Sequence, residues 1–175
     1  GQMIHANRSR LHFPDYTPKA PGVQASEPFM IWRKRYINYA MDEMVRGVLR
    51  SELARELVNR TKGSIANVLL DIPSHIVSDE GEPGRDANGM LQAILTRLSG
   101  LDDILGRIDY AYRMVAQDEQ SKARRDLDDY VREPGVDMTT FRLHFEHRIF
   151  MADTVAETNW SVTYKTEKFL EKARI

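Results

Sequence analysis

The motif in this chain that comes nearest to a metal site is His144-Phe145-Glu146-His147. Histidines three residues apart occupy neighbouring positions on a helix, where they could share a cation. A site needs further ligands, and di-iron bundles supply them with a Glu-x-x-His motif on each of two helices. That motif is absent, because Phe141 and His144 stand three residues before the two histidines. His144 and His147 are therefore weak candidate ligands, and exposed helix histidines are the alternative. We expect no cofactor.

Arrangements that could activate a nucleophile are also missing. Ser74 and His75 are sequence neighbours, which is not the geometry of a catalytic triad. The chain has no Gly-x-Ser-x-Gly turn, and Arg60–Ser64 has the residue types of a phosphate-binding loop in the wrong order. The acidic segment Ser78–Gly89 lacks an oxygen ligand at the first position of a calcium-binding loop. The sequence therefore assigns no catalytic residue and no small-molecule substrate, and we do not expect an enzyme.

Basic side chains are concentrated in one segment. Between Phe29 and Lys62 there are eight Lys and Arg residues against four Asp and Glu. Arginine and lysine on one helix face neutralise phosphates, so a regulator that binds DNA or RNA is one functional hypothesis. A solvated face with ion pairs is the alternative. The candidate nucleic-acid contacts are Arg46, Arg50, Arg55, Arg60 and Lys62.

Composition limits the remaining function classes. The 175 residues carry a formal net charge of −1, which gives no general attraction to nucleic acid or to anionic lipid. There is no cysteine, so disulfides, thiolate catalysis and cysteine-bound metals are excluded. No apolar run approaches the ~18 residues of a membrane span, and the N-terminus lacks the apolar region of a secretory signal. We expect a soluble, cytoplasmic protein without a membrane partner.

The residues that break helices are clustered, and their clusters define the expected elements. Breakers gather at Pro14–Pro28, Gly63–Gly89 and Pro134–Gly135, whereas no Gly or Pro follows Val136. Apolar residues recur at helical spacing between these clusters. The pattern predicts an all-α bundle of three long helices with one or two short ones. We expect one domain over residues 29–175, preceded by an extended, Pro-rich arm over residues 1–28.

Two stretches leave the helical pattern open to other interpretations. An apolar stripe from Leu91 to Val115 runs through Ser99-Gly100, which favours one kinked helix. In the last region, residues 160–164 alternate apolar and polar as a strand does, and residues 10–13 have a similar pattern. A minor β-ribbon between residues 10–13 and 160–164 is therefore possible, although one continuous last helix is favoured. Ser78–Gly89 is expected to be a mobile loop.

These features favour a non-catalytic module that binds other proteins. Reactive constellations are lacking, and eight methionines accompany aromatic residues on broad helical faces. Such residues serve both cores and interfaces. We expect an adaptor, an assembly factor or a structural subunit that binds a protein partner or self-associates as an oligomer. The DNA- or RNA-binding regulator remains the alternative.

Overall fold

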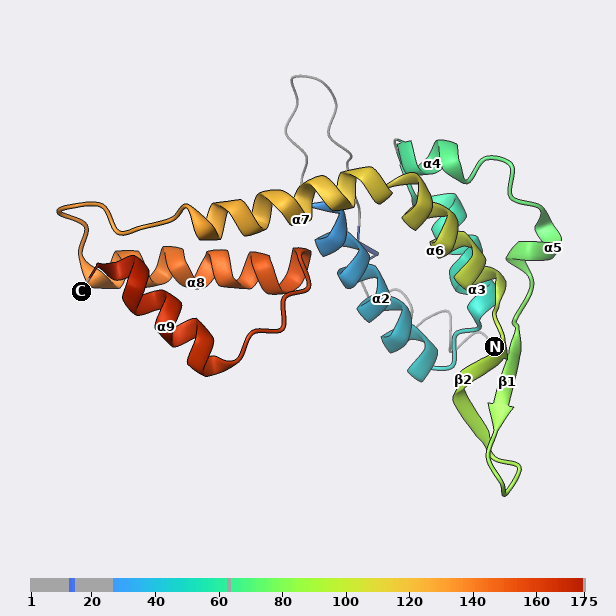
Figure 1. Ribbon diagram of the computed structural model, residues 1–175. Helices are drawn as coiled ribbons and strands as arrows, with labels where there is room; N and C mark the ends of the chain where they lie inside the picture. Colours follow the sequence, from blue (N-terminus) through green and yellow to red (C-terminus); the bar gives the residue numbers. More distant parts are fainter. Residues whose placement is uncertain (1–12, 15–26, 63, 175) are drawn as a thin grey trace. The chain divides into compact units, whose positions relative to one another are not determined.

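The computed structural model describes residues 13–14, 27–62 and 64–174 (Figure 1). Over these residues the fold is all-α, as the sequence predicts, with one small two-stranded sheet at a place that the sequence did not indicate. The described residues form two compact units, of which the first contains Phe13, Pro14, Glu27 and Trp32–Arg113, and the second contains Pro28–Ile31 and the chain from Met114 onward. The elements in chain order are α2 (Phe29–Val45), α3 (Arg50–Arg60), α4 (Ser64–Val68), α5 (Ser74–Val77), β1 (Glu82–Arg85), β2 (Leu91–Arg97), α6 (Gly100–Ala111), α7 (Arg113–Asp128), α8 (Met138–Val155) and α9 (Val162–Ala173). The predicted boundary between arm and helical domain at residue 28 stays a prediction, because most of the arm lies outside the described residues.

The first predicted long helix is in fact two helices, α2 and α3. Gly47 adopts φ of 93°, a left-handed conformation that ends helices and that glycine adopts without strain. The next helix begins three residues later, where the Glu80 carboxylate accepts hydrogen bonds from the backbone N–H groups of Arg50 and Ser51 at 3.0 and 2.8 Å. Such a carboxylate satisfies free N–H groups and favours the positive end of the helix dipole. The predicted continuity across Gly47 was therefore wrong.

An aromatic cluster forms part of the core of the first unit. Phe13 packs edge-on against Tyr36 and Tyr39 of α2, with ring centroids 5.8 and 5.7 Å apart. Trp32 stacks on Tyr36 and donates from Nε1 to the carbonyl oxygen of Pro14 at 2.6 Å. The guanidinium of Arg60 lies 4.7 Å from the centroid of the Phe13 ring. Phe13 and Pro14 are thus held to α2 and α3 by side-chain contacts.

A β-hairpin stands where the sequence favoured a loop followed by a kinked helix. Strand β1 pairs antiparallel with β2, with Glu82 opposite Arg97 and Pro83 opposite Leu95. Helix α6 then begins separately, capped by the Ser99 side chain. The close approach at Gly100 fixes this break, because a Cβ there would lie 1.6 Å from the carbonyl oxygen of Ile76. The prediction of one helix across Ser99-Gly100 was therefore wrong. The loop predicted over Ser78–Gly89 is interrupted by β1 at Glu82–Arg85, and its mobility stays a prediction.

The last helical region also divides in two. Helix α8 ends at Val155, and Glu157 adopts φ of 53°. Ser161 then caps α9 by accepting a hydrogen bond from the N–H of Tyr164 at 3.1 Å. Residues 162–164 belong to α9, so neither the favoured continuous helix nor the strand at residues 160–164 forms. The possible ribbon is excluded on this side, and residues 10–12 of its other side lie outside the described residues.

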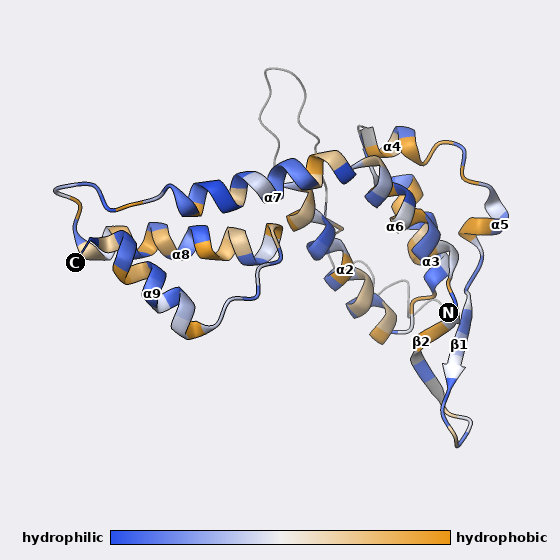
Figure 2. Ribbon diagram, viewed as in Figure 1, coloured by the Kyte–Doolittle hydropathy of each residue, from blue (hydrophilic) through white to orange (hydrophobic). Residues whose placement is uncertain are grey.

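The second unit packs α7, α8 and α9 around a small apolar core. Its buried members are Leu127, Phe141, Phe145, Ala152 and Ala173. Lys172 is only 4% exposed, and its ammonium donates to the carbonyl oxygen of Asp128 at the end of α7 at 2.6 Å. A cation there is favoured by the negative end of the helix dipole. Figure 2 shows that hydrophilic residues dominate most of α7, in agreement with its thin apolar stripe.

Candidate interaction surfaces

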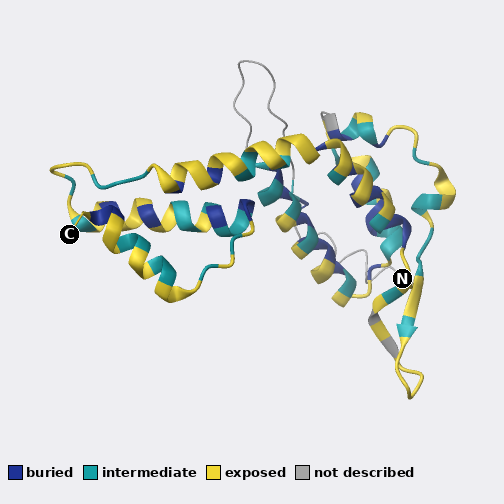
Figure 3. Ribbon diagram, in the orientation of Figure 1, coloured by how far each residue is buried: buried dark blue, intermediate teal, exposed yellow. Residues whose placement is uncertain are grey.

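Helix α8 is apolar on two opposite faces. Its core face carries the buried residues Phe141, Phe145, Ala152 and Val155. On the other side Leu143 is 62% exposed and Phe150 is 54% exposed. At about 100° per residue these two side chains point roughly 180–200° away from Phe141. Figure 3 shows buried and exposed positions alternating along the helix. One face therefore holds the second unit together, and the other is available to another molecule.

The exposed face forms a continuous stripe along α8. We call it the outer stripe, and it consists of Thr139, Leu143, Glu146, His147, Phe150 and Thr154. By helical geometry these positions lie within about 100° of one another around the helix axis. Five of them are exposed, and Thr154 is half-buried. The ionisable side chains of Glu146 and His147 thus lie at the centre of the outer stripe. Leu143 lies on one side of this centre and Phe150 on the other, and a threonine stands at each end.

The beginning of α8 is well fixed. The Asp137 carboxylate accepts a hydrogen bond from the N–H of Thr140 at 2.7 Å and from its hydroxyl at 3.1 Å. These hydrogen bonds hold the pKa of Asp137 below its usual value. A capped helix presents its side chains in defined positions. The outer stripe is therefore an ordered surface of the second unit.

Charged side chains flank the outer stripe in a local network. Arg142 Nε contacts Glu146 Oε1 at 3.0 Å, an exposed pair one helical turn apart. Arg148 donates to the carbonyl oxygen of His144 at 3.2 Å, and its guanidinium lies 3.8 Å from the centroid of the Tyr130 ring. Exposed ion pairs of this kind contribute at most about 1 kcal/mol to stability. His147 is exposed on the outer stripe beside these charged side chains.

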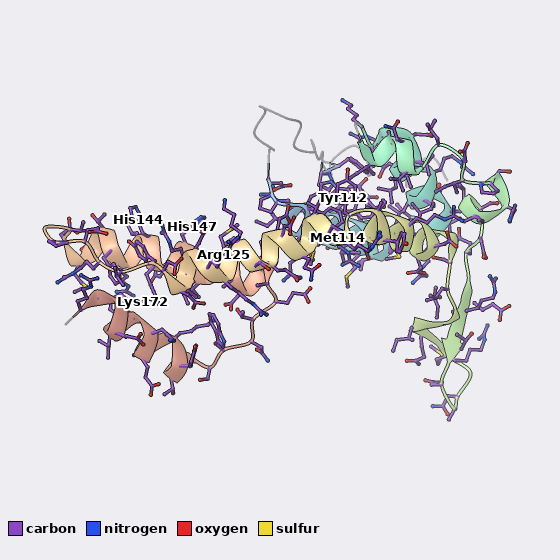
Figure 4. The ribbon with its side chains drawn as sticks, turned by 45° about the horizontal axis from the view of Figure 1, so that its top comes forward. Tyr112, Met114, Arg125, His144, His147 and Lys172 are labelled. Atoms are coloured by element: carbon purple, nitrogen blue, oxygen red, sulfur yellow. The ribbon has the colours of Figure 1, made fainter. Side chains whose placement is uncertain are left out.

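The predicted histidine pair is present on one helix but gains no further ligands. His144 and His147 are both exposed on α8 (Figure 4). Across residues 13–14, 27–62 and 64–174, no three His, Cys, Asp or Glu side chains gather closely enough to hold a metal ion. Two exposed imidazoles alone do not complete the coordination of a protein metal site. Within these residues the arrangement of His144 and His147 therefore favours the alternative, a pair of exposed helix histidines.

The β-hairpin presents a second exposed apolar surface. Met90, Ile94 and Leu98 are 66%, 81% and 67% exposed. Every second residue of a strand lies on the same face. Ile94 and Leu98, which directly follows β2, are four residues apart, and this spacing places them on one face of the hairpin. Gly84 of β1 lies across from them, since a Cβ at Gly84 would lie 3.0 Å from the carbonyl oxygen of Ile94. This side of the hairpin therefore combines large apolar side chains with bare backbone.

The base of the hairpin is rigidly held. Asp79 forms a two-bond ion pair with Arg97, at 2.6 and 3.0 Å, and accepts from the N–H of Gly81 at 3.0 Å. The hydrogen bonds from Arg97 hold the pKa of the Asp79 carboxyl below its usual value. The backbone of Gly100 donates to the carbonyl oxygen of Asp79 at 2.8 Å. These contacts fix the hairpin to the start of α6, although Met90, Ile94 and Leu98 are exposed.

The five predicted nucleic-acid contacts are distributed over three structural contexts. Arg46 lies in the turn after α2, Lys62 follows α3, and the others belong to α3. Arg50, Arg55 and Arg60 are spaced five residues apart, so each is turned about 140° from the one before it. The break at Gly47 and this spacing place them on different sides of the chain rather than on one helix face.

One of these arginines already has contacts within the first unit. Arg60 lies over the Phe13 ring and forms an ion pair with Glu56 at 3.8 Å. Glu56 also accepts a hydrogen bond from the hydroxyl of Tyr39. Arg60 thus links α3 to the aromatic cluster. Nucleic-acid binding by the five residues stays a prediction.

The outer stripe was not predicted from the sequence, although its signal is present there. The predicted helical face followed Phe141, Phe145 and Ile149, which are the core residues. Leu143 and Phe150 are seven residues apart, which places them on one side of a helix. Their spacing could have indicated a second apolar face.

No similarity to a known protein indicates a function for this chain. No protein-family model, no curated protein and no solved structure matches this chain. Among the helices of the described residues, none combines the length and the apolar character that a bilayer crossing requires.

Proposed function

We propose that this chain is a non-catalytic, helical protein-interaction module that acts as an adaptor, an assembly factor or a structural subunit. The observation that carries the proposal is the second apolar face of α8. Leu143 and Phe150 are large apolar side chains, more than half exposed, on a capped helix whose other face is already packed in a core. Large apolar side chains that gather on an ordered surface mark sites of protein contact.

The energy available at this face is enough to matter for binding. Burying a fully exposed Phe or Leu side chain contributes about 1.5–3 kcal/mol. With over half of each side chain still exposed, a partner that covers Leu143 and Phe150 gains roughly 1–2 kcal/mol from each. A tenfold change in affinity corresponds to about 1.4 kcal/mol. The pair therefore contributes measurably to an association, which must also draw on other contacts of the same surface.

Light scattering on the purified chain tests the proposal. We expect a particle heavier than one chain of 20.2 kDa, formed with a second copy or with a co-purifying protein. The double change Leu143→Ser with Phe150→Ser should shift the mass towards the single chain. Val162→Ser with Leu170→Ser is a matched control, because it removes two other exposed apolar side chains from the same unit.

Two outcomes would argue against the proposal. One is a mass of 20.2 kDa at every concentration with no co-purifying protein. The other is an equal loss of association in the control pair, which would indicate general stickiness rather than a defined surface. Circular dichroism of each variant checks that the helices remain folded.

A further inference from the structure

Along the outer stripe of α8, the order of residue types is similar from either end of the helix: polar, apolar, ionisable, apolar, polar. Its centre lies between Glu146 and His147, an acid beside a group that accepts a proton. One turn away on either side stands a large apolar residue, Leu143 before the centre and Phe150 after it. A threonine follows at each end. A stripe with this internal symmetry is complementary to itself when one copy is reversed.

We propose that a second copy of this chain docks on the outer stripe, with its α8 antiparallel to the first. The proposal rests on the proposed function and names the partner at that surface. In a pair centred between residues 146 and 147, Leu143 faces Phe150 of the partner subunit. Glu146 faces His147 of the partner subunit, and Thr139 faces Thr154 of the partner subunit. Each contact occurs twice, as in a twofold interface.

Charge distinguishes this arrangement from a parallel one. In the antiparallel pair each carboxylate of Glu146 meets an imidazole, which donates a hydrogen bond or carries a positive charge. A parallel pair would set Glu146 against Glu146 of the partner subunit, and like charges in an interface are unfavourable. Arg142, which flanks the outer stripe, contacts Glu146 within the same helix at 3.0 Å, so in the antiparallel pair this carboxylate would be shared between Arg142 and His147 of the partner subunit.

The size of the surface indicates a reversible dimer. Residues 139–154 of a helix extend over roughly 22 Å. One helical stripe of this length is smaller than a standard stable interface of about 800 Å² per partner. We therefore expect a dissociation constant in the micromolar range, which light scattering or sedimentation can follow by dilution. The chain's net charge of −1 sets no strong repulsion against self-association.

Cysteine cross-linking tests partner and direction together, because the chain contains no cysteine of its own. Thr139→Cys and Thr154→Cys leave the apolar and ionisable centre intact. We expect a disulfide-linked dimer when the two variants are mixed and oxidised, and little from either variant alone. In the antiparallel pair two copies of residue 139 are separated by roughly 22 Å along the helix axis.

Other cross-linking patterns would overturn the inference. Dimers from each single variant alone indicate a parallel pair, and an absence of dimers in all mixtures excludes a second copy at this surface. The proposed function would survive the second result if the purified assembly instead holds a different protein that cross-links to residue 139 or 154. It would fail with the inference if the chain is also monomeric and without a co-purifying protein.

A charge exchange at the centre gives an independent readout. Glu146→Lys should weaken the dimer at least about tenfold, because a lysine then faces His147 of the partner subunit at two symmetric places. Adding His147→Glu restores the opposite pairing and should recover most of the affinity. His144→Ser is the control, since His144 is exposed on α8 outside the outer stripe. Weakening by His144→Ser, or no recovery in the double variant, would contradict the proposed register.

Discussion

Two phenylalanines on α8 should respond very differently to truncation. Phe145 is 4% exposed and packs against Phe141 and Phe169, with ring centroids 6.0 and 5.4 Å apart. Phe150 lies on the outer stripe and is 54% exposed. Both stand in the interior of the same helix. Phe145→Ala and Phe150→Ala therefore differ chiefly in the face that loses its ring.

The expected magnitudes follow from burial. Removing a buried Phe side chain costs about 3–5 kcal/mol, because transfer energy is lost and a cavity remains. Phe145→Ala should cost an amount in this range. Phe150→Ala should cost less than about 1 kcal/mol, as is usual for surface substitutions without special contacts. The small core of the second unit makes the first loss a large share of its stability.

Urea unfolding followed by circular dichroism measures both changes. The protein should be dilute, so that self-association does not add to the apparent stability. We expect a clear fall in the unfolding midpoint for Phe145→Ala and little change for Phe150→Ala. Equal losses, or a larger loss for Phe150→Ala, would mean that the outer stripe is part of the fold and not a free surface.

Three further substitutions test the fold of the first unit and the start of α2. Gly100→Ala should destabilise the protein by at least about 2 kcal/mol in urea unfolding, because its Cβ would lie 1.6 Å from the carbonyl oxygen of Ile76. Gly106→Ala is the matched control: nothing lies within 4 Å of its added Cβ, so it should stabilise α6 by up to about 1 kcal/mol. Tyr36→Phe should raise the free energy of unfolding by about 1 kcal/mol, since the buried Tyr36 hydroxyl has no hydrogen-bond partner among the described residues. A fall in the free energy of unfolding of this variant would contradict the expectation. Burial raises the pKa of Glu119 above 4.5 although its carboxylate accepts from the N–H groups of Phe29 and Met30. The folded state then holds this proton more tightly than the unfolded state, so stability should fall as the pH rises from 4.5 through the raised pKa. Glu119→Gln should flatten that part of the stability profile, and an unchanged slope would refute the assignment.

The helical character of the chain could be predicted because helix signals are local. The spacing of Phe29, Trp32 and Tyr36 marks one face of a helix, and all three are buried. Asp137, a residue type that favours the N-cap position of a helix, caps α8. The positions at which helices break were harder to predict. Gly47 is a single residue in an otherwise continuous pattern, and the carboxylate that caps the start of the next helix belongs to Glu80, 30 residues along the chain from Arg50.

The hairpin shows where local patterns fail. Leu91, Ile94, Leu95 and Leu98 fit helical spacing, yet residues 91–97 form a strand. The strand depends on pairing with Glu82–Arg85 and on the contact of Arg97 with Asp79. Neither is encoded in the spacing of the apolar residues, because whether a segment forms a strand depends on the segment that pairs with it and on the contacts around it.

Only some of the apolar residues that recur at helical spacing in α2 are buried in the core. Met41, Val45 and Leu49 stand in one row at a constant spacing of four residues, yet all three are exposed. The turn at Gly47 interrupts the row, so it no longer follows one helix face. Periodicity finds an apolar face but does not decide whether the protein's own chain covers it. The outer stripe was missed for the same reason, because two apolar faces on α8 merge into one pattern.

Hydroxyl-radical footprinting of the side chains is the most direct measurement of whether the outer stripe is a protein-binding surface. Oxidation of Leu143 and Phe150 should be compared between the assembled protein and the diluted single chain. We predict that both residues become protected on assembly, while Val162 and Leu170 of α9 react equally in the two states. Equal oxidation of Leu143 and Phe150 in both states would contradict a partner on this face.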